Sequence, residues 1–252
     1  MERNLLLISN SRVAGGQLFD HAKDEIKEIL GDRKVITFMP YARPGGMSYS
    51  EYYEKLRPVF AGMGYDLRLL DPGCINIAEA ILVGGGNTWE LLRTLKKEGL
   101  YFAIESAVRE RGIPYIGSSA GANVAGLTIG TTNDMPAAES DGRDALGLVH
   151  FNINPHYQDT VRLTPAEREA VLAAAPQLRI LLDHQGETRD DRIMEYHALG
   201  NRETVVALRE GSMLRVDGQH ITLKGATGCK VFKPREAPVE YKQGATLDYI
   251  LS

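Results

Sequence analysis

Short apolar runs alternate with longer stretches of helical periodicity through the first half of the chain. Between the runs, apolar residues recur at helical spacing over Gln17 to Leu30 and over Leu91 to Val108. This βαβ rhythm predicts an α/β fold, with a mostly parallel sheet flanked by helices on both faces. The expected buried strands are Leu5 to Ile8, Val35 to Met39, Leu67 to Leu70, Ala80 to Val83 and Ile113 to Ile116.

The last third of the chain has a different pattern. Met213 to Val216 and Ile221 to Leu223 flank the turn dipeptide Asp217-Gly218, which predicts a C-terminal β-ribbon at one edge of the sheet. Thr164-Pro165-Ala166-Glu167 combines an N-cap residue, a proline at the first helical position and a capping glutamate, so we expect a helix to about Ala175. A chain of 252 residues can form one α/β domain, and we start from a single domain over 1–252.

The composition of the chain limits the kinds of molecule that it is expected to bind. With 29 Lys and Arg against 33 Asp and Glu, the net charge of −4 gives no general attraction to nucleic acid or to an anionic membrane. The apolar run near the start is too short for a spanning helix or a signal segment. Cys74 and Cys229 lack disulfide-framework or metal-ligand spacing, so we expect a cytoplasmic protein without a metal site, acting on a small solute.

The strand Ile113 to Ile116 leads into Gly117-Ser118-Ser119-Ala120-Gly121, which fits the pattern G-x-S-x-G centred on Ser119. A nucleophile raised on a sharp strand-to-helix turn needs very small neighbours two residues away on each side. The next N–H, that of Ala120, then points at the oxyanion position. A tight turn whose glycines serve only helix packing is the alternative, and Ser118 is the competing hydroxyl.

A second set of backbone N–H groups follows the strand Ala80 to Val83, in Gly84-Gly85-Gly86-Asn87-Thr88. Ligands of open α/β sheets bind at such strand ends. The segment lacks G-x-G-x-x-G and the lysine of a P-loop, which weakens a phosphate site. The other hypothesis is the second half of an oxyanion hole, with Gly86 allowing close backbone approach.

A serine nucleophile needs a base, and the chain offers six histidines. His156 ends the extended run Val149 to Pro155 at a turn, where a strand end can present its side chain to a cleft. His184 lies before Gly186-Glu187-Thr188-Arg189 and is an alternative anion ligand. At the end of the expected strand Thr204 to Leu208, Glu210 is one of 33 acidic residues, and the pattern alone does not select it.

Several segments in order along the chain resemble the aspartyl dipeptidase (peptidase E) family of serine peptidases, which is itself similar to the cyanophycinases. The resemblance runs from the amino terminus to about Lys233. The matching segments are LLLISNS near the start, VGGGNTWELL from Val83, IGSSAGAN from Ile116, TTNDMP from Thr131, INPHY from Ile153, GETRDDRI from Gly186 and LREGS from Leu208.

This resemblance implies a doubly wound fold similar to class I glutamine amidotransferases, and a triad of Ser119, His156 and Glu210. It implies no cofactor and a substrate dipeptide with a free N-terminal aspartate. A guanidinium can grip a carboxylate with two parallel bonds. Arg189 is therefore the candidate ligand of the aspartate carboxylate, with His184 beside it. Further substrate-binding candidates are Glu187 and Asp134, near the amine, and Asn87.

Two features depart from the family pattern. Ser118 stands where some members carry tryptophan, and residues 158–183 form an inserted helical segment where a short loop is expected. This segment is a candidate lid or a contact with a second subunit in a homodimer. The alternative functions are a cyanophycinase-like or isoaspartyl peptidase, a non-enzymatic metabolite-binding module and, more distantly, a dinucleotide-binding oxidoreductase.

Overall fold

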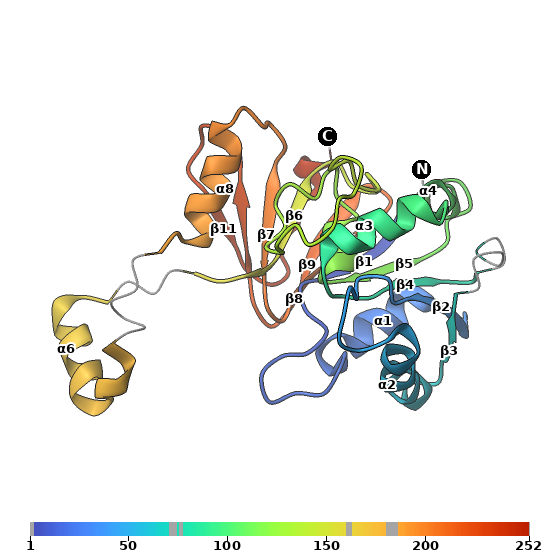
Figure 1. The fold of residues 1–252 in the computed structure, drawn as a ribbon, viewed down its shortest axis with the longest axis horizontal. Helices are drawn as coiled ribbons and strands as arrows, with labels where there is room; N and C mark the ends of the chain where they lie inside the picture. Colours follow the sequence, from blue (N-terminus) through green and yellow to red (C-terminus); the bar gives the residue numbers. More distant parts are fainter. Residues whose placement is uncertain (1–2, 71–74, 76–77, 160–162, 180–185, 252) are drawn as a thin grey trace.

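A computed structural model describes residues 3–70, 75, 78–159, 163–179 and 186–251, and Figure 1 shows their arrangement. The larger sheet has seven strands in the order β3-β2-β4-β5-β1-β8-β9. All contacts among its first five strands are parallel, which confirms the predicted mostly parallel sheet. The strands are β1 (Asn4–Ile8), β2 (Val35–Met39), β3 (Asp66–Leu69), β4 (Ile81–Val83), β5 (Tyr115–Ser118), β8 (Ser212–Asp217) and β9 (His220–Gly225).

The predicted ribbon is the hairpin β8-β9. It adds to the larger sheet through an antiparallel contact between β1 and β8, which leaves β9 at the sheet edge as expected. The ribbon is not the whole of the remaining β structure, however. A second sheet in the order β11-β10-β7-β6 was not predicted, and its strands are β6 (Asn152–Tyr157), β7 (Val205–Arg209), β10 (Cys229–Phe232) and β11 (Val239–Tyr241).

Helices cover both faces of the larger sheet, as predicted. Leu6 and Ile8 of β1 belong to a core cluster with α1 and α2, whereas Leu5 and Leu7 belong to a cluster with α3 and α4. This alternation follows from the two-residue period of a strand. The helices are α1 (Lys23–Leu30), α2 (Tyr49–Gly62), α3 (Thr88–Lys97), α4 (Leu100–Arg109), α5 (Ala120–Asn123), α6 (Pro165–Ala174) and α8 (Arg189–Ala198), with 3-10 turns η1 (Asp20–Ala22), η3 (Pro176–Leu178) and η4 (Asp248–Ile250).

Two predicted helices have different limits in the structure. The stretch Gln17 to Leu30 becomes helical only at Asp20, because Phe19 has a left-handed backbone with a φ of 58°. The stretch Leu91 to Val108 is divided between α3 and α4 by Gly99, whose φ is 67°. Helix α2 was not predicted, although Ser48 and Glu51 form the capping box at its start.

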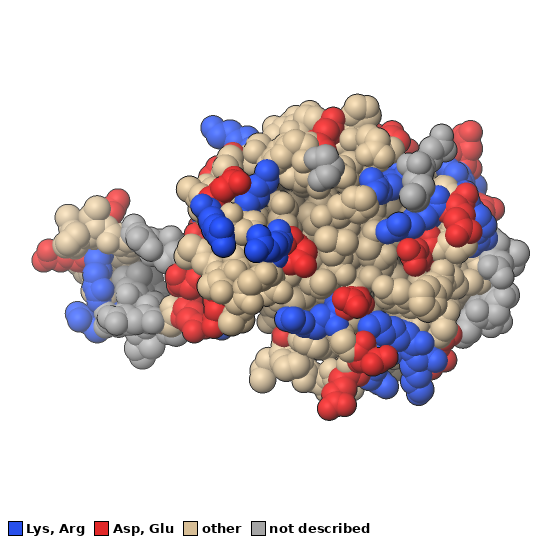
Figure 2. All heavy atoms as spheres, turned by 90° about the horizontal axis from the view of Figure 1, so that it is seen from above, with Lys and Arg blue, Asp and Glu red and all other residues tan. Residues whose placement is uncertain are grey.

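Helix α6 stands away from the two sheets in Figures 1 and 2. Its predicted capping box is present, because Thr164 Oγ1 accepts a hydrogen bond from Glu167 N while Glu167 Oε2 accepts one from Thr164 N. None of its residues is buried. No helix within the described ranges has the length and apolar character that crossing a membrane requires.

Candidate active site

Ser119 lies directly after β5 and before the short helix α5. Its φ of 56° is in the left-handed region, which is costly for a residue with a side chain and typical of a nucleophile raised on a tight turn. Ser119 N donates to Ile8 O at 2.9 Å, and the carbonyl of Ser119 accepts from Ala122 N and Asn123 N. These bonds fix the turn from both sides.

The glycines on either side of the turn are required by close packing. A Cβ on Gly121 would collide with the carbonyl of Val83, and one on Gly117 would collide with the carbonyl of Gly121. The steric demand expected from G-x-S-x-G is therefore present. The competing hydroxyl, Ser118 Oγ, is fully buried and has no hydrogen-bond partner among the described residues.

His156 faces Ser119 from an irregular end of β6. The register between β6 and β7 shifts between Asn154 and Tyr157, and His156 itself has a φ of 54°. A bulge of this kind redirects a side chain out of the regular alternation of a strand. Ser119 Oγ and His156 Nε2 are 2.8 Å apart.

Glu210 completes a chain of hydrogen bonds. Its Oε1 lies 2.8 Å from His156 Nδ1. Because a carboxylate can only accept, Nδ1 carries the proton, which leaves Nε2 free to accept from the serine hydroxyl. Glu210 stands on the tight connection between β7 and β8, where its carbonyl accepts from Thr227 Oγ1 at 2.8 Å and Gly211 N donates to Asn10 Oδ1 at 2.8 Å.

Ser9 has a role at this site that the sequence did not reveal. Its hydroxyl donates to Leu208 O at 2.9 Å and accepts from His156 N at 2.9 Å. The ends of β1, β6 and β7 are thereby joined beside the hydrogen-bond chain. The only signal in the sequence was the position of Ser9 within the segment LLLISNS.

Two backbone N–H groups are available beside Ser119. Ala120 is the first residue of α5, so its N–H has no acceptor within the helix. Gly85 packs against Ser119 and its N–H donates to Tyr52 Oη at 3.2 Å, which leaves the next N–H, that of Gly86, as the second candidate. Gly86 has a φ of 143°, and a Cβ there would collide with the carbonyl of Ala42.

Arg189 is the first residue of α8 and is half-buried. Its Nη1 donates to Asn133 Oδ1 at 2.5 Å, and no carboxylate of the described residues lies within ion-pair distance of its guanidinium. Burial lowers the pKa of Arg189 from its ordinary value, yet an arginine remains charged at neutral pH. Asn133, which was not predicted, also donates to Pro155 O at 2.6 Å and so connects Arg189 to the residue before His156.

The other predicted binding residues have different surroundings. Asp134 Oδ2 accepts from Thr88 N and Thr88 Oγ1, and Asn87 Oδ1 accepts from Glu90 N, so both side chains cap the start of α3. Glu187 is exposed and pairs with Arg192 at 3.6 Å. His184 lies outside the described residues.

Comparison with known proteins places these features in a family. The model of Peptidase family S51 matches residues 5–224. A Drosophila melanogaster protein named "Probable alpha-aspartyl dipeptidase" is 38% identical over 259 aligned positions, covering 99% of this chain and 98% of the relative. Peptidase E of Nostoc sp. is 38% identical over 257 positions, covering 100% of this chain and 98% of the relative.

Solved structures share the fold. The crystal structure of a peptidase from an acI-B1 Actinobacterium superposes with a TM-score of 0.67 at 16% identity, covering 98% of this chain and 97% of that one. The sequence resemblance to the aspartyl dipeptidases is thus confirmed over nearly the whole chain. The chain belongs to peptidase family S51.

Proposed function

We propose that this protein is a serine peptidase that hydrolyses dipeptides with a free N-terminal aspartate. The observation that carries the proposal is the continuous chain of hydrogen bonds from Ser119 through His156 to Glu210. The names of the relatives in family S51 supply the substrate class, since they include alpha-aspartyl dipeptidase and peptidase E.

In the proposed reaction, Ser119 Oγ attacks the carbonyl carbon of the aspartyl residue while His156 Nε2 takes the hydroxyl proton. Glu210 stabilises the imidazolium that forms. The negative charge that develops on the carbonyl oxygen is stabilised by the N–H groups of Ala120 and Gly86.

His156 then gives its proton to the departing amine nitrogen as the C–N bond breaks, which leaves an ester between the aspartyl group and Ser119. A water molecule, deprotonated by His156, attacks that ester. Ser119 recovers its proton and the free aspartate leaves.

Arg189 is the proposed ligand of the substrate's side-chain carboxylate. It is half-buried, it has no acidic partner among the described residues, and Asn133 connects it to the strand that carries His156. A charge-assisted bond in such a position favours aspartate over asparagine, which has the same shape without the charge. The contacts of Asp134, Asn87 and Glu187 support capping and surface roles more than direct substrate binding.

The test is a panel of free dipeptides, α- and β-linked, with Asp, Asn or Leu at the first position. We expect hydrolysis of α-linked Asp-X, lowered by about 10⁴-fold or more in Ser119→Ala. Ser118→Ala is the matched control, because that neighbouring hydroxyl contacts none of the proposed catalytic groups and the variant should remain active. Cleavage of Asp-X by Ser119→Ala would contradict the assignment, and a preference for β-linked substrates would replace it with an isoaspartyl peptidase.

A second comparison with the same dipeptides tests the preference for aspartate at the first position. Arg189→Met should lose most of the preference for Asp-Leu over Asn-Leu, whereas Arg192→Met, which removes an exposed cation of the same helix, should keep it. An unchanged preference in Arg189→Met would move the carboxylate ligand elsewhere.

We further propose one peptidase domain interrupted by residues 158–183, a cytoplasmic location and a homodimer. A reducing compartment suits Cys229, which is buried and free. Helix α6 leaves Val171 and Leu172 only partly covered, and a second copy of the chain would bury them. Analytical ultracentrifugation tests the dimer, and a monomer at all concentrations would contradict it.

A further inference from the structure

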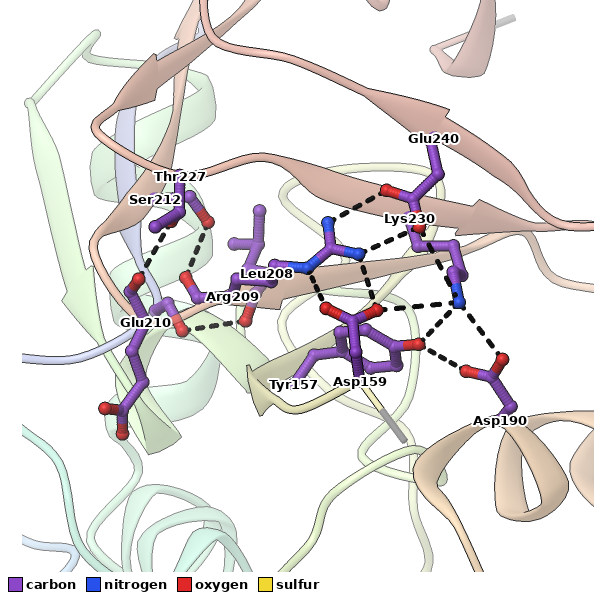
Figure 3. Close-up of polar contacts among 11 residues, drawn as sticks. Tyr157, Asp159, Asp190, Leu208, Arg209, Glu210, Ser212, Thr227, Lys230 and Glu240 are labelled. Carbon is purple, nitrogen blue, oxygen red and sulfur yellow. Dashed lines mark hydrogen bonds and ion pairs between the residues drawn. The ribbon is translucent and has the colours of Figure 1, made fainter. Parts of the chain in front are cut away.

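Three residues with proposed roles in the reaction each have a chain neighbour in a second polar cluster. They are His156, Arg189 and Glu210. Tyr157 follows His156, Asp190 follows Arg189, and Arg209 precedes Glu210. Figure 3 shows that the carboxylate of Glu210 points away from this cluster, while the Arg209 guanidinium points into it. We call these residues the charge cluster, which consists of Tyr157, Asp159, Asp190, Arg209, Lys230 and Glu240.

Arg209 connects the end of β7 to two carboxylates. Its Nε and Nη2 donate to Asp159 at 2.5 and 2.7 Å, and its Nη1 and Nη2 donate to Glu240 at 2.9 and 2.8 Å. Its guanidinium also lies 5.4 Å from the ring centre of Tyr157, the residue paired with Arg209 in the β6-β7 register. Arg209 is therefore fixed from three directions immediately before Glu210.

Lys230 connects the second sheet to the start of α8. From β10, its Nζ donates to Tyr157 Oη at 2.8 Å and to Asp190 Oδ2 at 3.0 Å. Tyr157 Oη in turn donates to Asp190 Oδ1. Asp190 is thus bound through both carboxylate oxygens, one residue after Arg189 (Figure 3).

The two cations of the charge cluster are well covered. The side chains of Lys230 and Arg209 are 15% and 20% exposed, and they face three carboxylates. Hydrogen bonds to Asp159 and Glu240 raise the pKa of Arg209, and hydrogen bonds to Tyr157 and Asp190 raise the pKa of Lys230 although burial opposes this. Both groups stay charged at neutral pH, so their ion pairs persist at that pH.

We propose that the charge cluster positions the active site through two arms, which are linked because Lys230 Nζ also lies 3.7 Å from Asp159 and 3.6 Å from Glu240. In one arm, Arg209 positions Glu210 against His156. In the other, Lys230, through Asp190, positions Arg189 for the substrate's carboxylate. The proposal rests on the proposed function. Within the part of the chain that the structure describes, neither Arg209 nor Lys230 makes a hydrogen bond to Ser119 or His156, so both are positioning residues.

The two arms predict different kinetic defects. A displaced Glu210 no longer orients the imidazole, which lowers kcat for every substrate, whereas a displaced Arg189 weakens only the binding of the aspartate carboxylate. Misplacement of a catalytic group by about 1 Å can cost as much as ~100-fold in rate. We therefore expect the Arg209 arm to change kcat and the Lys230 arm to change KM and the preference for aspartate.

The experiment compares Arg209→Met and Lys230→Met in the full chain, with Asp-Leu and Asn-Leu as substrates. Arg209→Met should lower kcat about 10-fold or more for both substrates and keep their ratio of kcat/KM. Lys230→Met should raise KM for Asp-Leu and lower the Asp-Leu to Asn-Leu ratio about 10-fold, with kcat nearly unchanged. Arg209→Lys and Lys230→Arg retain the charge and should recover part of each loss.

Arg215→Met is the matched control. Arg215 is a similarly covered cation, 10% exposed on β8, and its carboxylate partners Glu28 and Asp217 lie outside the charge cluster. Its loss should lower the melting temperature without changing kcat, KM or the substrate ratio. If Lys230→Met does not fold, Asp190→Asn carries the test of that arm, because it keeps the side-chain shape and removes the charge.

The outcomes separate the inference from the proposed function. If the wild-type chain does not hydrolyse Asp-Leu, the proposed function is wrong and the inference fails with it. If the wild type is active but the two variants show the same kinetic defect, or only the stability loss of Arg215→Met, the two-arm inference alone is overturned. Failure of Lys230→Met and Asp190→Asn to fold would also overturn it, since the cluster would then serve stability.

Discussion

Residues at the active-site end of the strands meet across large sequence distances, whereas helix α6 is specified almost entirely by residues beside it. Ser119, His156 and Glu210 come from three separate strand ends, and Ser9 joins His156 to Leu208. In α6 the capping box joins Thr164 to Glu167, and no residue is buried. The active-site geometry of this chain thus depends on contacts between residues far apart in the sequence. Among the described residues, helix α6 has no such contacts, because none of its residues packs into a core.

Glu210→Gln is the strongest way to test this comparison in solution. The change keeps the side-chain shape but removes the charge that stabilises the imidazolium. It also replaces one carboxylate oxygen with an NH2 donor, which can hold His156 in the wrong tautomer. By analogy with other triads, kcat for Asp-X should fall by roughly 10³- to 10⁴-fold.

Glu169→Gln is the control in the inserted segment, because Glu169 is exposed on α6. It should leave kcat and KM unchanged. If the two variants have similar activity, Glu210 is not the acid that orients His156, and the hydrogen bond between them has no catalytic consequence.

The same distinction explains which elements were predictable from the sequence. Helix α6 was predicted from Thr164, Pro165 and Glu167 alone, because its capping signals lie within four residues. The central parallel strands were predicted because buried strands in such a sheet are continuously apolar. The prediction of a buried strand over Leu67 to Leu70 was wrong in burial, because β3 lies at the sheet edge and exposes all its residues but Leu67. Ser119 was predicted because Gly117 and Gly121 answer a local steric demand.

The second sheet and the supporting residues depend on distant partners. Asn152 pairs with Val205 across more than 50 positions, and no local pattern indicates that β6 and β7 are neighbours. Ser9 bonds to the backbone of Leu208 and His156, and Asn133 bonds to the backbone of Pro155. Backbone groups occur at every position, so they give no sequence signal. Glu210 had the same limit: only the family resemblance separated it from the other acidic residues.

Core packing provides the next test. Leu208 of β7 is fully buried beside the active site, whereas Leu172 of α6 is only partly covered. Leu208→Ala should lower the free energy of unfolding by about 2 to 5 kcal/mol, because it leaves a cavity in a packed core. Leu172→Ala should change it by less than about 0.5 kcal/mol.

Urea unfolding of both variants measures their losses in the free energy of unfolding. The protein concentration should be kept low so that association does not add stability. Similar losses in the two variants would mean that α6 packs against the protein in solution as tightly as a core strand. Dependence of the Leu172→Ala effect on protein concentration would instead support the proposed dimer.

The smallest expected effect concerns Asp159, the second residue of the inserted segment. The hydrogen bonds from Arg209 lower the pKa of Asp159, and hydrogen bonds from Thr164 lower the pKa of Glu167 in α6. A carboxylate with a lowered pKa stabilises the folded state above its unfolded pKa, and this contribution is lost as the pH falls through the lower folded value. The wild type should therefore exceed Asp159→Asn in stability by up to about 1 kcal/mol at neutral pH.

That difference should be constant down to about pH 5 and shrink below about pH 4, near the ordinary pKa of aspartate. The stability difference between the wild type and Glu167→Gln should follow the same pH trend, but only Asp159 should be coupled energetically to Arg209. Combining Asp159→Asn with Arg209→Met should cost less than the sum of the single changes, because both remove one interaction, whereas Glu167→Gln should be additive with Arg209→Met. Additivity at both sites would show that Asp159, like Glu167, is not coupled energetically to Arg209, although Arg209 donates two hydrogen bonds to it.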